Sequence, residues 1–555
     1  MVPIITAWHQ GGVGGPTGGE RHGVASGAVP EGGAGAPRSA PAGRVLPVFC
    51  ALLLAQLLAG LDTIILITAL PTIVGDLGGL NELSWVLTAY MLTSTASTPL
   101  LGKLSDLVGR KTLFQLSLLV FLAGSALSGQ SHSITELIAF RGLQGIGAGG
   151  LGVLGRTIVA DIVPGRQLGK YQGIMTSSFA IASVAGPLVG GFFVDHASWR
   201  WIFYVNLPLG LVVLAVTAVA LHLPGTRRRV VLDYRGSLLL VASIVCVLLA
   251  STWAGTRYRW DSAPVLGLLG TGAGLAAAFV VEERRAPEAV MPIRLFRDRV
   301  YAVSSAAGFV LGMAMFGPWS VMPIFLQVVT GASATNAGLL LLPLLAAFTF
   351  TSVFAGVMIT RLGRYRVFPI VGTALMVVGF VFYASMNAST TRLQASVYMV
   401  VVGLGVGLML QVLTIAVQNS VDPHDLGAAT AGVQFFNTIG GSFGTAIYLS
   451  ILSGGLSHWL PRLVPPSAHL SPSILEGSPS QIRTLPAHVH AGVVQSYAQA
   501  VHSVFVGVVP LAAVGFVMML FLRDVPLRDA SALELLAEPL VADRQVAEPA
   551  GGQQA

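Results

Sequence analysis

The sequence predicts an all-α polytopic membrane protein with fourteen transmembrane helices. Of its 555 residues, 54% are hydrophobic and only 10% are charged, whereas an ordinary soluble domain is about 25% charged. From Val45 onward, apolar runs recur at about 20 residues each, the length that a helix needs to cross roughly 30 Å of hydrocarbon. These observations exclude a soluble protein.

The apolar runs divide the chain into spans and connecting segments. The expected spans are 46–71, 84–104, 113–131, 135–157, 172–194, 202–222, 236–254, 263–281, 301–326, 336–360, 367–387, 395–418, 428–453 and 499–522. Residues 1–44, rich in Gly, Pro and Ala, are expected to form a disordered tail. The Pro- and Ser-rich stretch 454–498 is expected to be a long external loop, and 523–555 a solvated tail.

The basic residues predict how the chain is oriented. If the N-terminus is cytoplasmic, 24 of the 31 basic residues fall on the inner side, six on the outer side and Arg141 in the membrane. This bias places both termini in the cytoplasm. Three lysines against 28 arginines favour a GC-rich bacterial genome and therefore a bacterial plasma membrane. The net charge of +7 is accordingly interpreted as topology, and no nucleic-acid partner is expected.

An internal repeat predicts two related bundles. Gly102–Arg110 and Gly356–Arg364 both read as Gly, six residues, then Gly-Arg, at a turn after a predicted helix. The two copies are equivalent if six-helix bundles at 45–222 and 300–522 flank an inserted helix pair at 223–299. Parallel repeats of this kind are typical of transporters.

Five motifs occur in order along the chain at the expected helices. They are Asp62–Pro71, Gly102–Lys111, Arg141–Gly147, Gly186–Gly191 and Trp199–Pro208. Together they resemble the major facilitator superfamily and, more specifically, its fourteen-span drug:proton antiporters, over residues 46–522. The resemblance implies the major facilitator fold and proton-coupled export of small lipophilic or cationic compounds such as drugs, antibiotics and dyes. It implies no covalent chemistry and no cofactor, and we expect a monomer whose partners are protons, substrate and the lipid bilayer.

Asp62 and Arg141 are the candidate proton-coupling residues. Asp62 is the only acidic residue well inside a predicted span, and Arg141 is the only basic residue deep in one. Ionisable groups there are costly and mark function by default. At 1.5 Å per residue both lie roughly 9–14 Å from the outer ends of their helices. The resemblance assigns this arginine to proton coupling, and we expect protonation of Asp62 to weaken the pair. The plainer alternative is that the two residues only tie helices together.

Two glycine-containing motifs are candidate conformational elements. In the first, the resemblance implies a cytoplasmic latch formed by Gly102, Asp106, Gly109, Arg110 and Lys111; a positive-inside anchor is the simpler interpretation. Thr360 stands where the second copy would carry the aspartate, so the latch is expected to be asymmetric. In the second, Gly186, Pro187, Gly190 and Gly191 predict a bend and close packing. The resemblance associates this motif with exporters, and the alternative is a kinked packing helix.

Polar and aromatic residues in later spans are candidates for a substrate cavity. The polar candidates are Gln56, Gln327, Gln411, Gln434 and Asn437. Met313, Met315, Phe316 and Trp319 are candidates for an adaptable apolar lining, although ordinary helix packing is the simpler interpretation. The span 336–360 has no acidic residue, which by the resemblance favours monovalent cations, neutral lipophiles or weak acids over dications.

Other functional classes have little support in the sequence. Gly145–Gly150 matches GxGxxG and Gly440–Gly444 matches GxSxG, but both lie inside predicted spans with no preceding strand. Two cysteines exclude a disulfide framework, and the histidines of 454–498 lack a compact metal-ligand spacing. The alternatives left open are a narrow exporter or symporter of one metabolite, such as a self-made antibiotic, an amino acid or a lipid, and, more remotely, a membrane-embedded enzyme or receptor.

Overall fold

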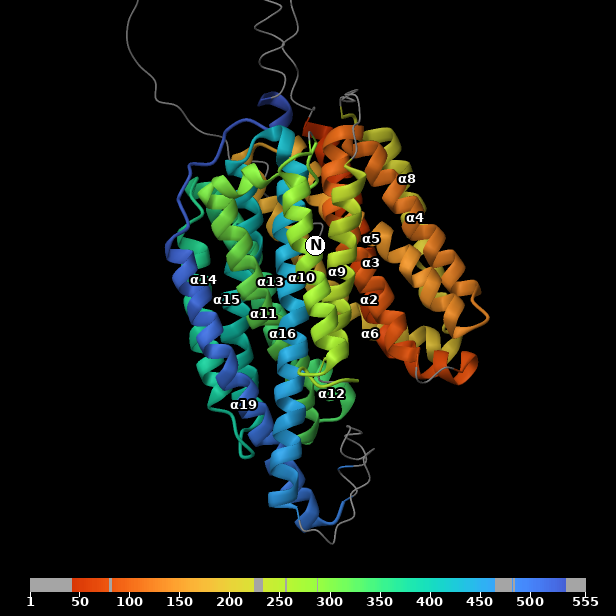
Figure 1. The fold of residues 1–555 in the computed structure, drawn as a ribbon, viewed down its shortest axis with the longest axis vertical. Helices are drawn as coiled ribbons and strands as arrows, with labels where there is room; N and C mark the ends of the chain where they lie inside the picture. Colours follow the sequence, from red (N-terminus) through yellow and green to blue (C-terminus); the bar gives the residue numbers. More distant parts are fainter. Residues whose placement is uncertain are drawn as a thin grey trace, which may run out of the picture. The chain divides into compact units, whose positions relative to one another are not determined.

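The described residues form a bundle of long helices (Figure 1). The computed structural model describes residues 42–78, 82–223, 233–254, 257–286, 288–464, 482 and 485–535. The helices of the first part are α2 (Ala42–Leu77), α3 (Leu83–Val108), α4 (Arg110–Gln130), α5 (Ile134–Ile162), α6 (Leu168–His196), α7 (Trp201–Tyr204) and α8 (Asn206–Ala220). Next come α9 (Tyr234–Trp253) and α10 (Ala263–Glu283). The last part comprises α11 (Arg299–Val328), α12 (Ala334–Leu340), α13 (Leu342–Leu362), α14 (Val367–Ala384), α15 (Arg392–Ser420), α16 (Leu426–Leu463) and α19 (Ala487–Leu520).

The fourteen expected spans all fall on helical segments of the described structure, although 202–222 is divided between α7 and α8 and 336–360 between α12 and α13. Thirteen helical segments there are long and apolar enough to cross a membrane. The exception is α3, which carries several Ser and Thr residues and two charges. Its hydroxyls find partners within the helix: Thr93, Thr95 and Thr98 each donate to the carbonyl four residues earlier. Such bonds satisfy polar groups locally. The composition of α3 therefore underestimates how well this helix is suited to cross a membrane.

The helices sort into two groups and a pair. Helices α2–α8 pack on one another, as do α11–α19, while α9 packs against α10 and also touches α3 and α16 (Figure 1). Leu240, Ile244 and Phe279 of the pair share a buried apolar cluster with Ala96 of α3 and Phe435 of α16. The inserted pair thus lies over the line where α3 meets α16.

The expectation of a solvated loop over 454–498 is wrong at both ends. Helix α16 continues to Leu463 and α19 begins at Ala487. Val489, Val493 and Tyr497 are spaced four residues apart and bury one face of α19 in an apolar cluster with Leu460. Residues 465–481 and 483–484 lie outside the described residues, as do 1–41 of the expected N-terminal tail.

The expectation of a solvated tail from 523 onward is also wrong for its described part. Residues 523–535, here called the C-terminal strap, return to the bundle. Tyr365 donates from its hydroxyl to the carbonyl of Arg523 over 2.9 Å. Burial raises the pKa of Tyr365 to about 12, so the hydroxyl remains a donor at physiological pH. Residues 536–555 lie outside the described part of the chain.

The strap touches both groups of helices. Asn419 at the end of α15 donates to the carbonyl of Pro526 over 3.0 Å and accepts from the amide of Arg528 over 3.0 Å. The carbonyl of Arg528 accepts from the amide of Arg166, between α5 and α6, over 2.9 Å. One short segment therefore joins the two groups at the end of the bundle that carries Gly102–Lys111.

Asn419→Ala should release the strap. The variant loses three hydrogen bonds to the strap. At about 1 kcal/mol each, their loss should let trypsin cleave after Arg523 and Arg528 about a hundredfold faster. Asn387→Ala, in a loop where that side chain accepts hydrogen bonds from the amide and the hydroxyl of Ser389, is the matched control. Equal cleavage rates in the two variants would contradict the assigned contacts.

Candidate functional site

A buried ion pair lies inside the first group of helices. Helix α2 carries Asp62 and α5 carries Arg141, and Nη1 of Arg141 donates to Oδ2 of Asp62. Asp62 is 3% exposed and Arg141 is 0% exposed. The two residues that the sequence placed at a common depth thus face each other. Their role in proton coupling stays a prediction.

Neutral polar side chains complete the surroundings of Asp62. Its Oδ1 accepts from Nε2 of Gln144 at 2.8 Å and from Nδ2 of Asn206 at 3.0 Å. Both amides also donate to the hydroxyl of Ser125, which donates in turn to the carbonyl of Phe203. The network draws on α2, α4, α5, α7 and α8, so the carboxylate is fixed by helices far apart in the sequence.

Arg141 depends on Asp62 for its counterion. Its Nη1 also donates to Oε1 of Gln144 at 2.7 Å, while Nε and Nη2 have no hydrogen-bond partner among the described residues. The ring of Tyr90 lies under the guanidinium, 4.1 Å from its centroid. This contact stabilises a cation but does not neutralise it. A proton on Asp62 would leave the buried cation without an opposite charge.

The carboxylate of Asp106 binds the start of a helix in the other group. Its two oxygens accept from the backbone amides of Gly427 at 3.1 Å and Ala428 at 3.0 Å, in the first turn of α16. A carboxylate is favoured there by the unpaired amides and the helix dipole. Arg110 binds Asp106 at 3.1 Å and Asp161 of α5 at 2.5 Å. Asp106 and Arg110 therefore connect α3, α5 and α16, while Lys111 donates to the carbonyl of Ala218.

Glycines allow close approach where the two groups meet. A Cβ at Gly102 would lie 2.4 Å from the Cβ of Ala431 and 2.8 Å from the carbonyl oxygen of Gly427. In the second repeat, a Cβ at Gly356 would lie 2.2 Å from the carbonyl oxygen of Gly169 on α6. Gly109 takes a φ of 106°, as the turn into α4 requires. The two copies of the repeat thus close two equivalent seams, α3–α16 and α6–α13.

The glycines of the Gly186–Gly191 motif pack α6 on α2. A Cβ at Gly186 would lie 2.6 Å from Cγ2 of Ile64, and one at Gly190 would lie 2.2 Å from the hydroxyl of Thr68. A Cβ at Gly191 would meet nothing within 4 Å. Pro187 lies within α6. The helix that carries Asp62 is therefore held tightly against α6.

Gly186→Ala should destabilise the protein, because the added methyl group forces α2 and α6 apart. Overpacking of this kind costs about 1–3 kcal/mol. Thermal unfolding of the purified protein in detergent measures the effect. The matched control, Gly191→Ala, should unfold within about a degree of the wild type. A Gly186→Ala variant as stable as this control would refute the close packing.

A model of the Major Facilitator Superfamily matches residues 52–445. The chain belongs to the major facilitator superfamily. It is therefore a multi-pass membrane transporter of small molecules and not an enzyme, and the resemblance drawn from its motifs is confirmed.

Known proteins of this superfamily resemble the transporter along most of its length. An uncharacterised MFS-type transporter of Mycobacterium tuberculosis is 40% identical over 497 residues, covering 89% of this chain and 72% of that protein. The multidrug transporter protein MdtP of Bacillus subtilis is 35% identical over 508 residues, covering 87% and 93%. The proton:xylose symporter XylE shares the fold, with a TM-score of 0.55, 12% identity and coverage of 89% and 99%.

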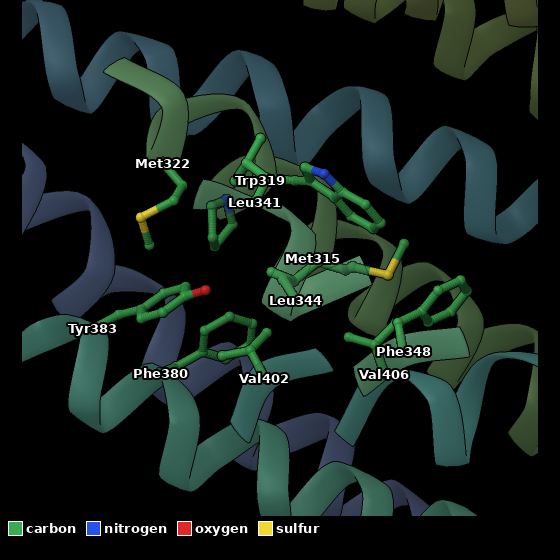
Figure 2. Close-up of a pocket in the computed structure, with 11 residues that line it drawn as sticks. Met315, Trp319, Met322, Leu341, Leu344, Phe348, Phe380, Tyr383, Val402 and Val406 are labelled. Atoms are coloured by element: carbon green, nitrogen blue, oxygen red, sulfur yellow. The ribbon is translucent and has the colours of Figure 1, made fainter. Parts of the chain in front are cut away.

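An apolar cavity lies within the second group of this transporter's helices (Figure 2). Its lining comprises Met315, Pro318, Trp319 and Met322 of α11, Leu341, Leu344 and Phe348, Phe380 and Tyr383 of α14, and Val402 and Val406 of α15. Its volume of about 20 Å³ holds roughly one water molecule. The hydroxyl of Tyr383 has no partner among the described residues, and Figure 2 shows it directed between the lining side chains. In this conformation the cavity is too small for a drug-sized molecule.

The aromatic and Met candidates divide between lining and packing. Met315 and Trp319 line this cavity. Phe316 stacks on Trp319 and packs against Gly441, and the backbone of Met313 packs against Gly444.

The polar cavity candidates of the transporter are not gathered in one place. None of the five lines the cavity of Figure 2. Gln411 is buried against Ser352, and Asn437 donates to the carbonyl of Gly308 at 3.2 Å, so both serve helix packing. Oε1 of Gln56 is buried without a partner in the described part of the chain, and Gln327 is partly buried. Gln434 accepts a hydrogen bond from Arg156.

Arg156 is the residue that sequence reasoning missed. It lies on α5 inside the expected span 135–157, where it had been attributed to the inner surface. A charge within an apolar run was the signal available in the sequence.

Proposed function

We propose that this transporter is a proton-coupled antiporter that exports small lipophilic compounds across the bacterial plasma membrane by alternating access. The observation that supports it most is the ion pair of Asp62 and Arg141, buried among neutral partners inside the first group of helices. An intramembrane carboxylate with a single basic partner is suited to exchange one proton and to change its surroundings when it does so.

Helix α2 packs on α6, so a change at the ion pair can be transmitted to the α6–α13 seam. Asp62 lies on α2 next to Ile64 and Thr68, which contact Gly186 and Gly190 of α6. At its other end, α6 contacts α13 through Gly169. A proton on Asp62 weakens the hold of α5 on α2, and any shift of α2 displaces α6 at the α6–α13 seam. Whether Asp62 is protonated or ionised thereby shifts the equilibrium between the open and closed forms of the α6–α13 seam.

The distribution of basic residues indicates which end of the bundle faces the cytoplasm during the transport cycle. The positive-inside bias places the end with Gly102–Lys111 in the cytoplasm. At that end Asp106 accepts a hydrogen bond from α16, and Gly102 and Gly169 pack against the opposite group, which supports a state closed to the cytoplasm. Substrate enters from the cytoplasm when both seams part and leaves to the outside after they close. A proton from outside then binds Asp62 and favours the parting of the seams, and it is released to the cytoplasm.

The proposed energy source is sufficient for export. One proton moving down 100 mV releases about 2.3 kcal/mol, which sustains roughly a fiftyfold gradient of a neutral substrate. The name of the Bacillus subtilis relative, a multidrug transporter, supports drug-like compounds as the substrates.

Efflux of the neutral dye Nile red from energised cells tests the proposal. Cells that express the protein should lose preloaded dye faster than cells with an empty vector, and a protonophore should abolish the difference. Efflux that persists with the protonophore would refute proton coupling. If the wild type exports no dye from a panel of neutral and charged lipophiles, the protein transports one narrow substrate instead.

A further inference from the structure

Arg156 bridges the two groups of helices. It lies on α5, and its Nη1 donates to Oε1 of Gln434 on α16 at 3.0 Å. Its own carbonyl oxygen accepts from Gln172 of α6 at 3.1 Å and from Gln418 of α15 at 3.3 Å. Four helices, two from each group, thus converge on this residue. This is where a substrate has to pass if the two groups move relative to each other.

The charge of Arg156 is not balanced by any described residue. Three cations within the described bundle contact a carboxylate: Lys103 contacts Glu288, Arg110 contacts Asp106, and Arg141 contacts Asp62. Lys111 and Arg200, near helix ends, donate to backbone carbonyls instead. Arg156 has no carboxylate within 4.0 Å in the described part of the chain, and its Nε is buried without a partner. An unpaired charge at membrane depth is costly, and it is retained where a ligand supplies the opposite charge.

Open space and a further donor lie beside the guanidinium. Gly152 precedes Arg156 by one helical turn, and a Cβ there would meet nothing within 4 Å. The side chains of Arg156 and Gln434 are both only partly buried. The amide Nε2 of Gln434 donates to no residue in the described structure, whereas its Oε1 is already used. Nη2 of Arg156 likewise donates to no described residue, and the guanidinium and the amide are joined to each other at 3.0 Å. Two neighbouring N–H donors of this kind match the oxygens of a carboxylate.

An aromatic contact marks where the lipophilic part of such a ligand fits. Phe179 of α6 and Trp319 of α11 meet edge to face across the two groups, with centroids 5.5 Å apart. Phe179 is seven residues from Gln172, or about 10 Å along α6. A molecule with an acidic group at Arg156 and an apolar body extending about 10 Å therefore reaches both features.

We infer that the substrates of this transporter are lipophilic acids, and that Arg156 binds their anionic group together with Gln434. This inference rests on the proposed export function and specifies its substrate class. Cations are disfavoured at this position, because the one unbalanced charge there is positive.

The test compares three pyrene compounds that differ only in charge. They are 1-pyrenebutyrate, its neutral amide, and the corresponding trimethylammonium compound. Full-length protein in proteoliposomes is driven by an imposed proton gradient, and initial transport rates are measured for each compound. The wild type should export the carboxylate about tenfold to a hundredfold more efficiently than the amide, as expected for a charge-assisted hydrogen bond.

Substitutions assign that preference to Arg156. Arg156→Gln should lower transport of the carboxylate at least tenfold relative to transport of the amide by the same variant, and Arg156→Glu should favour the ammonium compound. Arg166→Gln, an exposed arginine at the same end of the bundle, is the matched control and should keep the preference for the acid. Thermal unfolding of the purified variants in detergent shows separately whether the Arg156 variants fold.

Two outcomes would overturn the inference, and they are distinguishable from failure of the proposed function. If the wild type exports the amide or the ammonium compound as fast as the acid, proton-coupled export stands but the substrate class is wrong. If Arg156→Gln reduces transport of all three compounds equally, Arg156 only holds the helices together. A wild type that moves none of the three and also fails to extrude Nile red would refute the proposed function itself.

Discussion

Asp62→Asn should reduce Nile red efflux to the level seen with a protonophore. The amide keeps the size of the carboxylate but releases no proton and cannot neutralise Arg141. The buried cation then has no counterion, and removing one partner of a buried pair costs about 3–5 kcal/mol. Both efflux at matched expression and thermal unfolding should therefore change. This is the largest functional effect that we expect from any single substitution.

A matched control separates the two effects. Asp76→Asn lies on the same helix, where Asp76 accepts a hydrogen bond from Nε1 of Trp199 at 2.8 Å, and it should leave efflux proton-dependent. Combining Asp62→Asn with Arg141→Gln removes both charges, so stability should recover while efflux stays absent. Proton-dependent efflux at the wild-type rate in Asp62→Asn would show that another group carries the proton.

Gly102→Val should prevent closure of the α3–α16 seam. The Cβ of the new side chain would lie 2.4 Å from the Cβ of Ala431 on α16. It would also lie 2.8 Å from the backbone oxygen of Gly427, which cannot move aside as a side chain can. We expect transport to fall to background and the protein to stay open at this end. The native Cys50 and Cys246 are first replaced by Ser, and a cysteine is introduced at Ala431 as a reporter. A membrane-impermeant thiol reagent should label it faster in everted vesicles when Gly102→Val is present.

The matched control for this substitution is Gly267→Val on α10, where a Cβ would meet nothing within 4 Å. It adds the same side chain to a membrane helix and should alter neither transport nor labelling. If Gly102→Val transports normally, the contact between α3 and α16 is not part of the transport cycle.

The sequence predicted the helices better than it predicted their ends. Apolar length is set by the thickness of the bilayer, so every expected span fell on a helix. The approach failed where a helix continues beyond the hydrocarbon. Val489 and Val493 form an apolar stripe within a stretch that is polar on average. The C-terminal strap could not be predicted, because Asn419 binds backbone groups there that no side-chain pattern reveals.

The charged members of the candidate site were evident and the neutral ones were not. Asp62 and Arg141 stand out because charges are rare in membrane spans. Gln144 and Asn206 belong to motifs of the family, but nothing in the sequence indicated that they bind Asp62. Amides are common in helices, and these two residues lie 82 and 144 positions after Asp62 in the sequence. Arg156 lies at the end of an expected span, where a basic residue usually marks the membrane surface.

The construction of the Asp62 network has a consequence for biogenesis. Asp62 is synthesised 79 residues before Arg141, so α2 first enters the bilayer with a carboxylate whose partner is absent. That costs about 2.5–3.5 kcal/mol per charged side chain at the centre of a helix. The last hydrogen-bond donor to Asp62, Asn206, is synthesised only with α8, 144 residues after Asp62. The first group of helices therefore has to be completed before the hydrogen bonds of Asp62 are all made, and a nascent chain that stops before α8 leaves this carboxylate with one donor fewer.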